Sequence, residues 1–187
     1  MRVSGRALAA LVVTLIGACA TTQVVEQAAP LAETAFEVAG RLSARRGNEG
    51  AAAGFRWRHR SGEDALTFTN PLGSTLAQLD GGPGGVRLTF PDGRVTEARD
   101  WEALTLQALG APLPVRGLAW WIRGSPHPGS RHALERDRAL RPLVLRQDGW
   151  EVVYGYRDDS ARPRTLRLTY PDTEVRLAID TWNDEAR

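Results

Sequence analysis

The chain has 187 residues, enough for one domain with a sizeable core. It contains 24 basic and 22 acidic residues, and its formal net charge is +2. All the basic residues are arginines, and along the chain they alternate with acidic residues. A nucleic-acid-binding protein is expected to gather a basic excess on one face, so this composition argues against a nucleic-acid partner.

The first eighteen residues have the order of an export signal. Arg2 and Arg6 precede an apolar run over residues 7–16, and small residues then lead to Cys19. Positive charge, a short apolar run and a small-residue cleavage site are typical of a secretory signal peptide. The run is too short for a membrane-spanning helix, which needs roughly 20 apolar residues. We therefore predict a signal peptide over residues 1–18.

Cys19 is the only cysteine, so the chain cannot form an internal disulfide. Its place directly after the cleavage site resembles the lipidation site of bacterial lipoproteins. We expect diacylglycerol and an N-acyl group on Cys19 and no other cofactor. Ala20 at the next position indicates sorting to the outer membrane in enteric bacteria. Residues 19–35 then form a lipidated N-terminus, a tether and a short helix, and residues 36–187 form one domain.

From Phe36 onward, apolar and polar residues alternate with the period of half-buried strands. Turns rich in glycine separate the runs, as at residues 81–85, 91–93 and 148–149. About ten strands joined by short turns predict an antiparallel sheet. The residues expected on the inward face include Phe36, Val38, Leu42, Phe55, Trp57, Leu66, Phe68, Leu76, Leu88, Val152, Leu168 and Leu177.

Two helices interrupt the strands. Asp100 is suited to cap a helix that ends at Gly110. Pro114 suits the start of a second helix, which runs to Gly124. Helices inserted in a run of strands are expected to cover the open side of a curved sheet. The predicted fold is therefore mainly β with α.

The sequence lacks the patterns of common enzymes and metal sites. It contains no Gly-x-Ser-x-Gly and no phosphate-binding glycine loop. His127 and His132 are five residues apart across a Pro/Gly loop, which does not match a two-histidine metal face on a helix. His59, between two arginines, is expected at the surface. We therefore predict neither catalysis nor a metal site.

Two features leave alternatives open. Trp57, Trp121 and Trp182 fall on inward positions, where they either fill a core or line an apolar cavity for a ligand. Residues 70–75 form a turn with Leu72 near its tip. Leu72 either folds back onto the core or projects into lipid, where a leucine side chain gains about 1.5–3 kcal/mol.

A series of short motifs follows one order over residues 36–182. The most specific is Asn-Pro-Leu-Gly-Ser-Thr at residues 70–75. The others are Gly40-Arg41-Leu42, Phe55-x-Trp57, Leu109-Gly110 with Leu113-Pro114, Trp121-Ile122-x-Gly124-x-Pro126, Gly149-Trp150-x-Val152-Val153-Tyr154 and Trp182. On these motifs, the chain resembles the LolB family of outer-membrane lipoprotein receptors.

The resemblance implies an incomplete antiparallel β-barrel of about 10–11 strands, covered by short helices around an apolar cavity. It implies a receptor, lipid-anchored on the periplasmic face of the outer membrane, that takes lipoproteins from a LolA-like carrier and inserts them. Its partners would be that carrier, the acyl chains of the cargo and membrane lipid, and a monomer is expected. Leu72, with Pro71 and Gly73, would form the membrane-insertion loop. The inward positions assigned to the cavity are Phe55, Trp57, Leu66, Phe68, Leu118, Trp121 and Ile122.

Two other functions remain as alternatives. The first is a carrier-like or other lipid-binding lipoprotein with unknown cargo; such a carrier is normally soluble, so an anchor on Cys19 argues against it. The second is an enzyme on a β-barrel scaffold, against which the missing catalytic patterns argue.

Overall fold

A computed structural model describes residues 35–60, 62–158 and 160–183. The signal peptide and Cys19 lie outside the described residues. So does the tether with its short helix, except for Ala35. None of the helices in the described part is long and apolar enough to cross a membrane.

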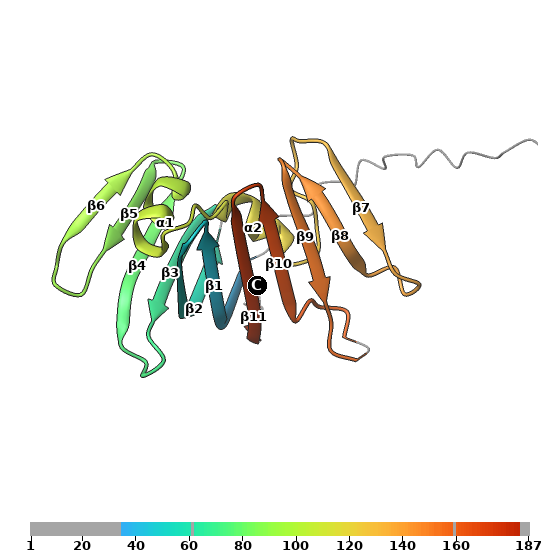
Figure 1. Ribbon diagram of the computed structural model, residues 1–187, viewed down its shortest axis with the longest axis horizontal. Coiled ribbons are helices and arrows are strands. Elements are labelled where there is room, and N and C mark those ends of the chain that lie inside the picture. Colours follow the sequence, from blue (N-terminus) through green and yellow to red (C-terminus); the bar gives the residue numbers. More distant parts are fainter. Residues whose placement is uncertain (1–34, 61, 159, 184–187) are drawn as a thin grey trace, which may run out of the picture.

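Eleven described strands form one antiparallel sheet that does not close into a barrel (Figure 1). Its order is β6-β5-β4-β3-β2-β1-β11-β10-β9-β8-β7, so the first and last strands pair at the centre. From there, successive hairpins lead outward to the two edges. The strands are β1 (Phe36–Arg46), β2 (Glu49–Arg60), β3 (Glu63–Thr69), β4 (Thr75–Gly82), β5 (Gly85–Thr89), β6 (Val95–Ala98), β7 (His132–Arg136), β8 (Pro142–Gln147), β9 (Trp150–Gly155), β10 (Thr165–Tyr170) and β11 (Thr173–Asn183).

The segment between β6 and β7 connects the two edges of the sheet and carries both helices. Helix α1 (Trp101–Leu109) starts at Asp100, whose carboxylate accepts from Ala103 N at 2.9 Å, and stops at Gly110, where φ is +71°. Helix α2 (Val115–Trp121) follows directly after Pro114. Helix α1 contacts β2, β5 and β6, so the cover lies on the sheet as the sequence predicts.

The inward face of the strands and the buried faces of the helices make one continuous apolar core. Trp57, Trp101 and Trp121 are its largest fully buried members. The alternation in the sequence predicts this face correctly except at Leu76, which is 44% exposed, and at Tyr170, which follows Leu166 and Leu168 in the alternation but is 43% exposed. Leu76 points outward because Phe68 of β3 pairs with Ala77, which places Ala77 on the inward face instead.

His59 is a second correction, because it is buried, not at the surface as expected. Only 4% of its area is exposed. It pairs across the sheet with Phe36 on one side and Asp64 on the other, all on the inward face. The flanking arginines, Arg58 and Arg60, point outward, so alternation through the strand was a better guide than the polarity of the residue.

The two central strands approach closely at Gly40. The pairing of β1 with β11 shifts register between Ala39 and Gly40. A Cβ atom on Gly40 would lie 2.1 Å from the Ala178 carbonyl oxygen, a backbone atom that cannot swing aside. The pairing that joins the two halves of the sheet therefore requires glycine at this position.

We predict that Gly40→Ala lowers the free energy of unfolding by about 1–3 kcal/mol, because the central strands must separate to admit the methyl group. Urea unfolding measures the effect. Gly84→Ala is the matched control, because a Cβ there meets no atom within 4 Å, and its effect should stay within about 0.5 kcal/mol. Equal stabilities of the two variants would contradict this account of the centre.

Candidate functional site

The seven residues predicted to line a cavity all lie in the apolar core, and each is at most 6% exposed. Phe55 pairs across the sheet with Phe68, and Trp57 pairs with Leu66, so β2 and β3 bring four of them together. Leu118, Trp121 and Ile122 come from α2 and its C-cap. In this structure the side chains are packed against the rest of the core and are not open to solvent.

Open hollows occur elsewhere on the described surface. One, of about 650 Å³, lies beside the β4–β5 turn and is lined largely by charged residues. A second, also about 650 Å³, involves β1 and β9–β11. None of the seven lines either hollow. A ligand between the sheet and the helices would therefore need the helices to move.

One side of α2 adjoins a buried polar cluster at the β2–β3 hairpin. The Trp57 indole N–H donates to Asp64 Oδ1 at 2.6 Å, and His59 Nδ1 lies 2.8 Å from the same oxygen. Asp64 is 5% exposed. A hollow of about 260 Å³, lined by these two polar side chains together with Arg116 and Trp120, separates the hairpin from α2. The seam along this side of α2 is thus incompletely packed.

The C-terminal end of α2 is held by Trp121 to the opposite half of the sheet. The Trp121 indole N–H donates to Gln147 Oε1 at 2.8 Å, and the backbone N–H of His127 donates to the same oxygen at 3.0 Å. Gln147 Nε2 in turn donates to the His127 carbonyl at 2.8 Å and to Ser130 Oγ at 2.9 Å. Gln147 is buried, so these bonds replace water and fasten α2 and the loop after it to β8.

Ser130, His127 and Asp148 meet beside this network without the geometry of a catalytic triad. His127 Nε2 contacts Asp148 and lies 3.5 Å from Ser130 Oγ, while Nδ1 contacts the Pro128 carbonyl. In a triad the acid and the nucleophile bind opposite nitrogens of the ring. Burial acts to raise the pKa of the Asp148 carboxyl, but hydrogen bonds from His127 and Ser130 outweigh burial and lower it. The three side chains form a hydrogen-bonded contact between the loop after α2 and the β8–β9 turn.

Outside these clusters, the described interior has few titratable or metal-binding side chains. Across the described ranges, no three His, Cys, Asp or Glu side chains gather closely enough to hold a metal ion. Tyr154 of β9 faces inward, and its buried hydroxyl has no hydrogen-bond partner among the described residues. Burial raises the pKa of this hydroxyl well above its usual value, so Tyr154 stays neutral. Apart from the Asp64 and Gln147 clusters, the described interior therefore offers mainly apolar surface.

Leu72 projects from a rigid turn. The Asn70 side-chain oxygen accepts from Leu72 N at 2.9 Å and from Ser74 N at 3.0 Å. Gly73 adopts φ +87° and closes the turn by donating to the Asn70 carbonyl at 2.9 Å. Leu72 is 92% exposed. Of the two alternatives for this leucine, the structure shows the one that points away from the core.

The sequence reasoning did not single out Asp64 and Gln147. Both carried a usable signal, because Asp64 is in phase with Leu66 on β3 and Gln147 is in phase with Leu145 on β8. A polar residue on the inward phase of a strand requires a buried partner. The alternation therefore predicts their burial, although it does not predict which donors they meet.

Comparison with known proteins agrees with this architecture. The family described as "Outer membrane lipoprotein LolB" matches residues 34–182. The outer-membrane lipoprotein LolB of Thiobacillus denitrificans is 39% identical, with 89% of this chain and 91% of the relative covered. That of an Azoarcus species is 37% identical, with 97% and 98% covered. In structure, a DUF1329 family protein from Desulfovibrio piger shares the fold at a TM-score of 0.53 and 8% identity, over 82% of this chain and 86% of that one.

The open sheet, its helical cover and the matching relatives define the class as an outer-membrane lipoprotein with a half-barrel domain. The chain belongs to the LolB family.

Proposed function

We propose that this protein is the outer-membrane receptor that accepts lipoproteins from a periplasmic LolA-like carrier and inserts them into the membrane. One observation carries the proposal: a member of an outer-membrane lipoprotein family has a large apolar face covered by two short helices. Residues 1–18 would be removed, Cys19 would carry the acyl groups, and residues 19–35 would tether the domain of residues 36–187. No enzymatic step is needed.

The physical problem is the exposure of acyl chains to water. Each CH₂ group costs about 0.8 kcal/mol outside an apolar environment, so a lipoprotein crosses the periplasm only with its chains shielded. The seven core residues would provide that shield once the helices separate from the sheet. Each transfer step lowers the free energy if this protein binds the chains more tightly than the carrier does and less tightly than the bilayer does. The anchor keeps the domain beside the acceptor membrane.

The seam between α2 and the β2–β3 hairpin is the place where we propose that the cover opens. A hollow already lies there, whereas Trp121, at the C-terminal end of α2, is fastened to Gln147 of β8. Opening along the hollow would expose Leu118 of α2 and Trp57 of β2, both in the assigned cavity. An acyl chain entering there replaces one set of apolar contacts with another, so the core is not left empty.

The Leu72 turn would act at the exit from the cavity. Asn70 holds the turn in shape, and Pro71 and Gly73 present Leu72 to the membrane. A leucine that enters the acyl region perturbs lipid packing locally at little cost to the protein, because the side chain makes no contribution to the core. The turn and the cavity therefore have separate tasks, namely insertion and uptake.

Cavity binding is tested with a photo-crosslinking amino acid in place of Leu118. We expect it to crosslink to the acyl chains of a labelled lipoprotein offered by a loaded carrier. The matched control is the same amino acid in place of Leu106, an exposed leucine of α1 that does not line the hollow, and it should give only background crosslinking.

Crosslinks of equal yield at both positions would contradict an acyl chain beneath α2. Absence of transfer from a cognate carrier, with the protein folded, would instead favour a lipid-binding lipoprotein with another cargo.

Leu72→Glu should slow insertion of cargo into vesicles by about tenfold or more, because a charged tip loses the gain of burying leucine in lipid. Uptake of cargo from the carrier should be unchanged. Val95→Glu is the control, since Val95 is an exposed apolar residue on β6, and it should leave both steps intact. Normal insertion by the Leu72 variant would refute the role of the turn.

A further inference from the structure

The β7–β8 turn is a second rigid tip. Asp137 N donates to the Arg141 carbonyl and Leu140 N donates to the Asp137 carbonyl, each at 2.9 Å. The Asp137 carboxylate also accepts from Ala139 N and Arg141 N, again at 2.9 Å. Four hydrogen bonds within five residues fix the shape of the turn, and Leu140 is presented in one orientation.

Leu140 is an unexpected residue at this position. Its φ is +62°, in the left-handed region that glycine and asparagine occupy readily and leucine does not. The side chain is 73% exposed, so packing does not compensate for the strain. Folding alone would favour another residue here, and such an outlier points to a role in binding.

Arginines surround Leu140. Arg136 donates to the Leu140 carbonyl at 2.8 Å. Arg141 pairs with Asp137 at 2.8 Å and donates to the carbonyls of Asp158 at 2.9 Å and Ser160 at 3.3 Å, which joins the turn to the β9–β10 loop. The exposed arginines of this joined surface are Arg136, Arg138, Arg157 and Arg162.

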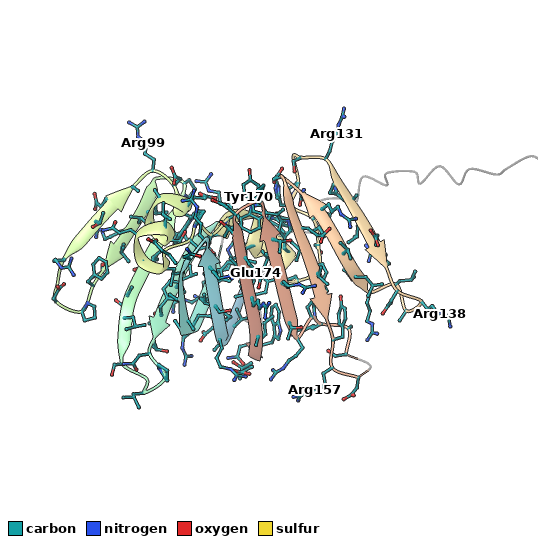
Figure 2. All side chains as sticks on the ribbon, viewed as in Figure 1. Arg99, Arg131, Arg138, Arg157, Tyr170 and Glu174 are labelled. Carbon is teal, nitrogen blue, oxygen red and sulfur yellow. The ribbon has the colours of Figure 1, made fainter. Side chains whose placement is uncertain are left out.

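The joined surface carries a basic excess. The charge of Asp137 is balanced by Arg141, and the β9–β10 loop contributes only Asp158 and Asp159 as acidic residues. Figure 2 shows Arg138 and Arg157 extending away from the sheet at its lower right. An apolar tip among outward-pointing guanidinium groups matches a surface with phosphates outside and hydrocarbon beneath.

We propose that the Leu140 turn is a second membrane contact, in which Leu140 enters the lipid and the arginines bind headgroup phosphates. The β3–β4 turn that carries Leu72 and the β7–β8 turn lie in opposite halves of the sheet, both on the lower side of the view (Figure 1). Two contacts this far apart would set the orientation of the sheet on the membrane, which a single lipid anchor cannot do. The inference rests on the proposed function, because that function places the membrane beside the domain.

The test uses the full lipidated chain in vesicles of phosphatidylethanolamine and phosphatidylglycerol. A nitroxide is attached to Leu140→Cys, to Leu72→Cys or to Arg58→Cys, which is exposed on β2 near the β2–β3 hairpin, at the end of the sheet away from the Leu72 turn. The single native cysteine would carry the anchor, so only the introduced thiol reacts. We expect the labels at 140 and 72 to gain collisions with oxygen and lose collisions with a water-soluble nickel complex, and the label at 58 to show neither change.

A label at 140 that stays in water while the label at 72 enters lipid would overturn this inference and leave the proposed function intact. If both stay in water, the inference fails together with the proposed insertion loop.

A second variant excludes a purely structural role for the turn. Leu140→Asn suits the left-handed backbone, so its Tm should equal or exceed that of the wild type, whereas cargo insertion into the same vesicles should slow by about tenfold. Unchanged insertion would overturn the proposal. Slower uptake from the carrier without vesicles would also overturn it, because the surface would then serve a protein partner.

Discussion

The pairing of β1 with β11 at the centre of the sheet is the constraint on which the rest of the structure depends. It joins two sets of hairpins, and it leaves β6 and β7 as distant edges that only the helical segment connects. That segment must therefore cross the apolar face. A sheet that joined its edges directly would have closed into a barrel with no movable cover.

The cover is suited to moving because it is stabilised mainly by its surroundings. Helices as short as α1 and α2 are not stable alone in water, and they are held by apolar packing with a few polar bonds. Thr105 of α1 binds the backbone N–H of Leu113 at 2.7 Å, which joins the two helices, while Gln147 fastens the far end of α2. Apolar packing is not directional, so acyl chains can replace it, whereas the polar bonds keep the cover attached.

The sequence predicts the sheet, both helices and the inward face, because the alternation and the caps are local signals. It predicts His59 wrongly, because the expectation followed the polarity of the residue and not its inward phase beside Asp64 of the neighbouring strand β3. It also predicts Leu76 and Tyr170 wrongly, and the phase of Leu76 depends on the pairing with β3. The short, polar edge strands β6 and β7 carry little alternation to detect. The sequence could not decide whether Leu72 points inward or outward, because its direction depends on the hydrogen bonds of the Asn70 side chain. It could not reveal the strain at Leu140 either, because that strain lies in the backbone angle φ.

In the proposed function, acyl chains occupy the space between the helices and the sheet. A distance between spin labels at Arg116 of α2 and Arg58 on the outer face of β2 reports on that space, because both side chains are exposed and lie on either side of the hollow. Double electron–electron resonance on the protein before and after it takes a lipoprotein from the carrier would measure this distance. We expect a longer distance in the loaded protein. An unchanged distance, with cargo demonstrably bound, would contradict acyl-chain binding beneath α2.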